Sequence, residues 1–539
     1  MKNTVICILT VTVLAILNTG CEREQNGELP AEESRLLYGF LEAKIIDSGT
    51  KEPVPARVYA IGSNDSLYFA ESCIPYEKPQ FLKRIGYSGE HFTAVDGAFT
   101  VKLPVGAATI RIERGKEFEP IEETVVIEAG QTIAREFMLN RWIDMASRGW
   151  YSGDLHVHRS LGDLGVLMIA EDLNVTTPQT VWGLKREPGL DEWLAKADAS
   201  GVIRVDDRRL FSVLGHEIER FRNSAVLFHH TGKTVLPVAD IEERGLPNMR
   251  LIENARAAGG YVEAEKPWWP ESHIDIAAGR ADFTGIANNH FTYKSYLPEH
   301  PRNRTEFGSD YAEGVEGYAA YVLDLYYAYL NCGFRVMPTA GSASGVLPNP
   351  LGYNRVYVKV DGGFTYDSWF AALKAGRCFV INGPLLVMTV NGSDTGDTVN
   401  PSGGTVRVRC EVSSLVPLDR LEIVRDGGVV LAVEPELAEN ATVVEADIPV
   451  TESGWLVARC FERRDDTVRF AQTAPVFVEV QGREFAPKRY AVEYFLRKTN
   501  ELVVRAETGE FESDEARNAA MDVFMSAKFL YEDLLKRSQ

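Results

Sequence analysis

The stretch GWYSGDLHVH, residues 149–158, decides how this sequence is interpreted. Successive side chains of a β-strand point to opposite faces, so His156 and His158 point the same way. Leu155 and Val157 then point into the sheet that carries the strand. Two neutral imidazoles on one rigid edge suit Zn²⁺, Mn²⁺ or Fe²⁺. Two histidines at a strand end also occur without a metal, because two ligands do not make a site.

Metal-capable side chains also follow later apolar segments that we predict to be strands. Each of these residues, taken singly, is more often structural than a ligand. Acidic and polar residues at strand ends nevertheless stand where α/β enzymes place function. Their recurrence in chain order favours one site built from several strand ends, whose further candidates are Asp163, Asp172, Glu217 and His290.

The pattern of the chain predicts four folded parts. Residues 37–140 carry short alternating runs with turns, typical of a small β-sandwich. Residues 150–384 alternate short apolar strands with helical stretches, which indicates an α/β region. Alternation returns over residues 385–482, as in a second β-sandwich, and residues 483–539 are predicted to be helical.

The N-terminus is typical of a secretory signal. Lys2 precedes an apolar run over residues 5–17, which is too short for a transmembrane helix. The small residues before Cys21 resemble a bacterial lipoprotein signal, in which that cysteine becomes the lipidated first residue. We expect a signal over residues 1–21, a flexible tether over residues 22–36, and an extracytoplasmic protein anchored to the membrane by lipid. Plain secretion is the alternative.

The composition argues against a nucleic-acid partner, and it does not decide whether the cysteines form a disulfide. The 539 residues carry a net charge of -20, which argues against nucleic acid because a phosphate backbone needs a basic surface. Cys410 and Cys460 fall in two predicted strands of one region. They are expected either to form a disulfide or to remain buried thiols.

The segment 149–158 resembles the opening motif of PHP-domain metallohydrolases, in particular their CehA/McbA branch. Residues 37–140 resemble carboxypeptidase-regulatory-like domains. The two resemblances imply a multidomain protein of the α/β plus β class, in which a PHP-like distorted β/α barrel is flanked by two β-sandwich domains and a C-terminal helical segment. Such barrels bind two or three metal ions and hydrolyse phosphoesters, esters or amides, with metal-bound water as the nucleophile.

The resemblance implies a set of ligands and bases. Glu217 matches the bridging glutamate of a Gly-x-Glu motif, and Glu217 or Asp163 is the expected general base. Zn, Mn or Fe is the expected cofactor, with fewer than three ions. The implied metal ligands are His156, His158, Asp163, Asp172, Glu217 and His290.

Four ligand positions of the family are filled differently in this chain. Leu173, Ala343 and Gly345 stand where the family has metal-binding side chains. Lys266 stands where a histidine precedes proline. It could supply a fixed positive charge in place of a lost cation, which makes it a catalytic candidate. The alternative for Lys266 is a surface lysine.

Two functions therefore stay open. The first is a lipid-anchored hydrolase with a reduced metal site, acting on a small molecule, carbohydrate or peptide. The second is a catalytically inactive cell-surface protein that binds carbohydrate or peptide. Trp182, Trp268 and Trp269 are candidates for an aromatic wall of the binding cleft, or for ordinary packing.

Overall fold

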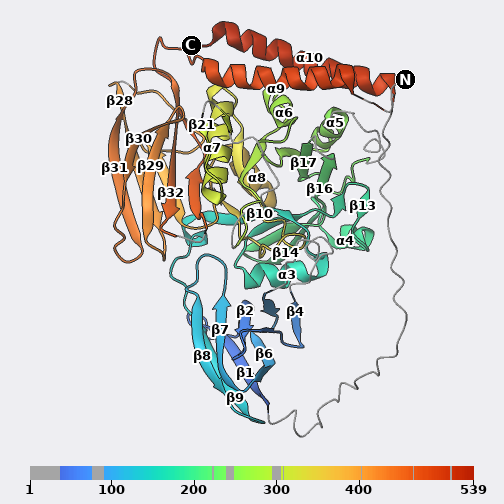
Figure 1. Cartoon of the computed structure of the whole chain (residues 1–539), viewed down its shortest axis with the longest axis vertical. Helices are drawn as coiled ribbons and strands as arrows, with labels where there is room; N and C mark the ends of the chain where they lie inside the picture. Colours follow the sequence, from blue (N-terminus) through green and yellow to red (C-terminus); the bar gives the residue numbers. More distant parts are fainter. Residues whose placement is uncertain are drawn as a thin grey trace, which may run out of the picture.

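A computed structural model describes residues 37–75, 90–220, 224–237, 248–293, 305–306, 309–401, 403–464, 467–509, 511 and 513–539. The predicted signal and tether, with Cys21, lie outside these residues. The chain is multidomain and built mostly of sheets. An N-terminal β unit, a central α/β region and a C-terminal β region follow one another, and two long helices close the chain at one end of the molecule (Figure 1).

The N-terminal unit is a β-sandwich, as predicted. One sheet has the strand order β6-β1-β9, and the other has the order β4-β5-β2-β7-β8, with β3 beside β2. Alternate side chains of β1, such as Leu41, Ala43 and Ile45, are buried against Val58 and Ile110 of the other sheet. The strands are β1 (Tyr38–Asp47), β2 (Ala56–Ile61), β3 (Leu67–Tyr68), β4 (Cys73–Pro75), β5 (Phe92–Ala94), β6 (Ala98–Pro104), β7 (Gly106–Glu113), β8 (Ile121–Ile127) and β9 (Thr132–Leu139).

The described strands of the central region form two large sheets and a separate two-stranded sheet of β20 (Thr305–Glu306) and β21 (Ser309–Asp310). One sheet has the order β13-β12-β16-β17-β18-β19-β22, and β14-β15-β11-β10-β23-β24 form one end of a second sheet. The barrel that the resemblance implies stays a prediction. The strands are β10 (Trp150–Val157), β11 (Val175–Pro178), β12 (Val181–Trp182), β13 (Lys185–Arg186), β14 (Val202–Asp206), β15 (Arg209–Ser212), β16 (His216–Arg220), β17 (Ser224–His229), β18 (Tyr261–Ala264), β19 (Phe283–Ala287), β22 (Met337–Ala340), β23 (Arg355–Lys359) and β24 (Cys378–Ile381).

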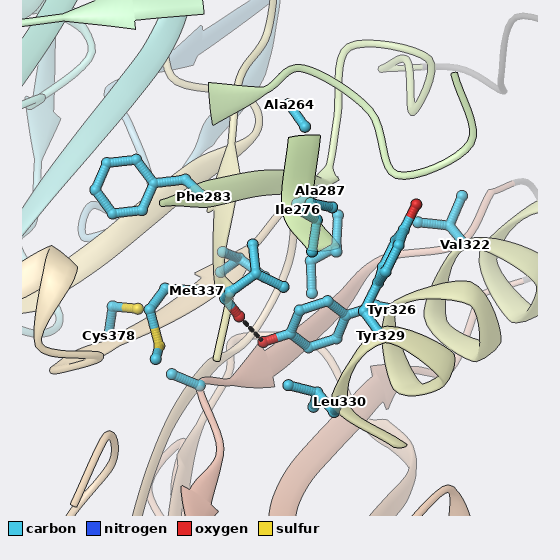
Figure 2. Close-up of a cluster of buried hydrophobic side chains, with 14 of the residues drawn as sticks. Ala264, Ile276, Phe283, Ala287, Val322, Tyr326, Tyr329, Leu330, Met337 and Cys378 are labelled. Carbon is cyan, nitrogen blue, oxygen red and sulfur yellow. Dashed lines mark hydrogen bonds between the residues drawn. The ribbon is translucent and has the colours of Figure 1, made fainter. Parts of the chain in front are cut away.

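Helices alternate with these strands and cover the sheets. The longest of them in this region turns Val322, Tyr326 and Tyr329 toward the strands that carry Phe283 and Met337 (Figure 2). The Tyr326 hydroxyl donates a hydrogen bond to the Val336 carbonyl over 3.1 Å, which satisfies it inside this core. The helices are α3 (Leu161–Ala170), α4 (Leu190–Lys196), α5 (Met249–Ala257), α6 (Ser272–Ala277), α7 (Val315–Asn331) and α8 (Tyr366–Lys374).

The C-terminal β region shares a sheet with the central region. β24 pairs with β33, and the same sheet continues into β32, β29 and β30. The domain boundary predicted near Pro384 therefore falls between strands that belong to one continuous sheet. A second sheet, β26-β25-β28-β31, packs against it. Cys410 and Cys460 are buried between them as free thiols, the second of the two predicted alternatives. The strands are β25 (Leu385–Val390), β26 (Ser393–Asp394), β27 (Thr398–Val399), β28 (Thr405–Ser413), β29 (Leu418–Arg425), β30 (Gly428–Val433), β31 (Ala441–Pro449), β32 (Gly454–Glu462), β33 (Phe470–Thr473) and β34 (Val476–Val478).

Two helices, α9 (Arg489–Thr508) and α10 (Asp514–Arg537), form the predicted C-terminal helical segment. The Ser513 side chain caps α10 by accepting from the Ala516 amide over 3.0 Å. Leu502 and Phe524 pack with Ile274 of α6, so the pair is docked on the central region. Among the described residues, none of the helices is both long and apolar enough to span a membrane.

We expect the docking of α9 and α10 to weaken in acid, because His273 of α6 is buried beneath them. Its Nε2 lies 3.1 Å from Thr499 Oγ1. Burial, followed by the charge of Lys498, lowers the pKa of His273 to about 3 from its usual 6.5. The lowered pKa means that the imidazole stabilises the docked state fully above pH 6.5, and that this contribution is lost as the pH falls toward 3.

Hydrogen exchange of α9 and α10, corrected for intrinsic rates, measures this effect. The opening equilibrium is expected to rise up to about tenfold per pH unit below 6.5, and a His273→Gln variant should show a flatter profile. Equal pH dependence in both proteins would mean that His273 is not the group responsible.

Candidate metal centre

His156, His158 and Glu217 converge on one point at the junction of the two central sheets. His156 lies on β10 and His158 directly follows it, while Glu217 is the second residue of β16. Nε2 of His156 and Nε2 of His158 are 3.1 Å apart. Glu217 Oε2 lies 3.3 Å from the first of these nitrogens and 3.0 Å from the second. The strand alternation that predicted a shared face for the two imidazoles is confirmed.

The spacing of these three atoms fits a shared cation. Ligands about 2.1 Å from a tetrahedral ion are separated by about 3.4 Å, close to the separations found here. All three side chains are buried, at 5–6% exposure. Glu217 Oε2 is also a buried oxygen without a well-oriented hydrogen bond, although two ring nitrogens lie beside it. Three donor atoms that crowd one point in this way are what a metal-binding triad presents.

The charges of the three groups depend strongly on one another. Burial alone would lower the pKa of His156, but Glu217 and then Glu265 raise it to about 10. Burial lowers the pKa of His158 in spite of Glu217. Burial opposes ionisation of Glu217, yet the two histidines hold its pKa well below the usual range. The carboxylate is therefore ionised, as a metal ligand must be.

Glu265 supports the triad from behind and was not among the residues predicted from the sequence. Its Oε1 lies 3.3 Å from His156 Nδ1, on the opposite side of the ring from the convergent Nε2. A carboxylate on the far nitrogen of a histidine fixes the ring and its tautomer, as in many metal sites. The Trp269 indole donates to Glu265 Oε2 over 2.8 Å. The only sequence signal was its place beside Lys266 in the altered histidine–proline segment.

Lys266 is buried next to the site, so the alternative of a surface lysine is wrong. Only 3% of the residue is exposed, and its ammonium pairs with Glu265. The nitrogen also lies 5.6 Å from the ring centroids of both Trp268 and Trp269. Lys266 therefore does not touch the triad itself. Its positive charge pairs with Glu265, the carboxylate that contacts His156.

The altered closing segment, residues 341–345, forms the floor under the histidines. The Ala343 amide donates to the His156 carbonyl over 2.6 Å, and the His158 amide donates to the Ser344 carbonyl over 2.8 Å. A Cβ at Gly341 would stand 2.4 Å from the His156 Cβ, so only glycine fits there. The segment thus keeps a scaffolding role although Ala343 and Gly345 offer no ligand.

No family model matches this chain, and no curated protein does either. Among solved structures, the chain is similar to a minor pilin of the Gram-positive pathogen Streptococcus agalactiae, at 17% sequence identity and a TM-score of 0.15. The match covers 20% of this chain and 45% of the pilin. A similarity of this size carries no argument about function, so the geometry of the site has to supply it.

Two of the predicted metal ligands, Asp172 and Asp163, lie outside the triad. Asp172 has both carboxylate oxygens in ion pairs, one 2.8 Å from Arg141 and the other 2.6 Å from Arg209. Asp163 lies in the first turn of α3, after the cap residue Ser160, where a carboxylate stabilises the helix. Neither belongs to the group of donor atoms within 4.8 Å of one another, which within the described ranges comprises His156, His158 and Glu217 alone.

His290 follows β19, as predicted, but lies outside that group as well. Its ring centroid is 5.4 Å from that of Trp268 and 6.1 Å from that of Tyr318, so it packs in an aromatic layer. Trp182 lies on β12 with its ring centroid 4.7 Å from that of His158, so this predicted aromatic residue is in ring contact with the triad. The triad therefore has an indole beside it.

Proposed function

We propose that this protein is a metal-dependent hydrolase of the PHP type, with one divalent ion held by His156, His158 and Glu217. The convergence of their three donor atoms within 4.8 Å carries the proposal. Two imidazoles and one carboxylate form a ligand set that catalytic zinc sites use, and it leaves a coordination position open. The PHP-like barrel and the extracytoplasmic lipoprotein location belong to the same proposal and rest on the sequence motifs.

The chain's own residues divide the remaining work. A divalent cation bound at the triad supplies a Lewis acid and lowers the pKa of water. Glu265 holds His156 in the orientation that directs Nε2 at the site, and Lys266 keeps Glu265 ionised. Burial would raise the pKa of Glu265, but Lys266 and then His156 hold it at about 2. Trp182, 37% exposed, offers an accessible ring beside His158 on which a substrate could stack.

A panel of neutral and anionic esters and an amide tests this function. With one equivalent of Zn²⁺, Mn²⁺ or Fe²⁺, the protein is expected to hydrolyse at least one of 4-nitrophenyl acetate, bis(4-nitrophenyl) phosphate and 4-nitroacetanilide. A His156→Ala, His158→Ala double variant should lose at least about a hundredfold in kcat/KM, since both donors are removed.

Absence of turnover on the whole panel, in protein that binds the metal stoichiometrically, would favour the alternative of a non-catalytic binding protein. That alternative has one observation in its favour: Ala343 lies under His156 where the family has a ligand. Turnover that survives in the double variant would place the activity outside the triad.

A further inference from the structure

A second polar cavity lies where the N-terminal sandwich, the central region and the C-terminal β region meet. Its volume is about 190 Å³, and its walls include Lys116 from the first, Tyr293 and Tyr353 from the second, and Arg469 from the third. None of the residues that line it belongs to the His156, His158 and Glu217 triad. The cavity is therefore separate from the candidate metal centre.

Three carboxylates line this cavity, and each lies beside an arginine that also lines it; that of Glu462 is 3.9 Å from Arg464. Arg57 pairs with Glu113 and lies 2.6 Å from Glu171, and Arg111 also pairs with Glu113. Burial would raise the pKa of Glu113, but Arg57 and then Arg111 hold it at about 2, so it is ionised. These pairs leave no carboxylate from the N-terminal sandwich for the remaining cations of the cavity.

Of the six cations that line the cavity, Lys116, Arg469 and Arg355 take no part in these pairs, and Arg355 donates to backbone carbonyls instead. Lys116 Nζ donates to the Asn382 carbonyl over 2.8 Å and lies 4.8 Å from the centroid of the Tyr353 ring. The Arg469 guanidinium carbon lies 5.8 Å from the same centroid and 5.7 Å from that of Tyr293. Within the described residues neither cation has a carboxylate within ion-pair distance, and Arg469 Nε is buried without a hydrogen-bond partner.

Tyr353 adds an unused donor to the same wall. The residue is 4% exposed, and its hydroxyl has no hydrogen-bond partner among the described residues. A buried hydroxyl without a partner loses free energy, and such groups are rare in folded proteins. The hydroxyl is carried by the ring that the ammonium and the guanidinium both approach, so three donors without a paired carboxylate lie around one ring of the cavity.

We propose that this cavity binds one small oxyanion, a carboxylate, sulfate or phosphate group, through Lys116, Arg469 and Tyr353. Arginine and lysine bind such groups by charge-assisted hydrogen bonds, and an anion would offset the cost of enclosing unpaired cations. The volume is below the 300–1,000 Å³ of pockets for drug-sized ligands, so the ligand carries few atoms besides the anionic group. Burial, reinforced by Arg469 and Arg355, lowers the pKa of Lys116 well below its usual value, and the charge of Glu462 opposes this only in part.

Equilibrium dialysis with radiolabelled inorganic phosphate, inorganic sulfate and acetate tests the site directly. The full protein is first treated with a chelator, and chloride holds the ionic strength constant. We expect saturable binding of at least one of the three anions, at about one per chain. The His156→Ala, His158→Ala variant should bind as the wild type does, because the cavity is separate from the triad.

Two variants of the cavity and one control complete the experiment. Arg469→Gln should weaken binding at least about tenfold and Tyr353→Phe several-fold, since each removes a donor. Arg407→Gln is the matched control, because Arg407 is a half-exposed arginine of β28 that pairs with Glu445. Failure of all three anions to bind saturably, or equal affinity in Arg469→Gln, would overturn the proposal. Loss of binding in the histidine double variant would also overturn it, because the anion would then occupy the metal centre.

Discussion

Changing Glu217 to Gln is expected to lower the affinity of the protein for Zn²⁺ by at least about a hundredfold. The variant keeps the shape of the side chain but removes the negative charge from the oxygen that lies 3.0 Å and 3.3 Å from the two imidazole nitrogens. Loss of an outer hydrogen-bond partner of a metal ligand costs about 10–100-fold, and loss of a ligand's charge should cost more. Competition with a chromophoric chelator measures the affinity.

Glu219→Gln provides the matched control for this experiment. Glu219 lies on the same strand two residues further on, outside the group of convergent donors. Its variant changes the charge of β16 by the same amount, so it should keep the wild-type affinity within about threefold. If both variants lose affinity equally, the metal is held by the general negative charge of this strand and not by the triad.

Changing Arg57 to Met is expected to destabilise the docking of the N-terminal sandwich by about 3–5 kcal/mol. The Arg57 guanidinium is 5% exposed and pairs with Glu113 of its own unit and with Glu171 of the central region. Removing it leaves two buried carboxylates without their shared counter-ion. Breaking a buried ion pair from one side costs far more than replacing all of its members.

Hydrogen exchange of β2 and β7 in the whole protein measures the loss. Arg135→Met is the matched control, because Arg135 is exposed on β9 and, within the described residues, its hydrogen bond goes to the neighbouring Ala134 carbonyl. The triple variant Arg57→Met, Glu113→Gln, Glu171→Gln should recover much of the protection. Wild-type protection in Arg57→Met would show that this ion network does not hold the units together.

Acid should act on the same network with a defined sign. The pKa of Glu113 is held at about 2 against its usual 4.5, so its pair stabilises the fold fully above pH 4.5. That contribution is lost as the pH falls from 4.5 toward 2. The contribution of His273 is lost at higher pH, so the two junctions should open in sequence on acidification, the helical pair first.

The part of the site that could be predicted is the part set by strand geometry. His156 and His158 share a face because side chains alternate along β10, and Glu217 is the second residue of β16, two residues after Gly215. Asp172 looked equivalent in the sequence but pairs with Arg141 and Arg209, which are 31 and 37 residues away in the chain. Because these arginines are distant in the chain, the sequence around Asp172 does not reveal that its carboxylate is used in ion pairs.

In the fold, too, the features set by local side-chain alternation could be predicted, and those set by pairing of distant segments could not. Alternation along β1 predicted the N-terminal sandwich, because burial on one face repeats every second residue. The continuity of the central and C-terminal sheets depends on the pairing of β24 with β33, segments separated by about 90 residues. Each strand has the apolar character of a buried strand, and that character does not specify its neighbour.

Metal content tests the central claim most directly. The protein, purified without a histidine tag, is stripped with a chelator, reloaded with Zn²⁺ or Mn²⁺, dialysed and measured by inductively coupled plasma mass spectrometry. We predict about one ion per chain in the wild type, less than about 0.1 in the Glu217→Gln variant, and about one in the Glu219→Gln control. A wild-type protein that retains no ion after loading with either metal would contradict the account.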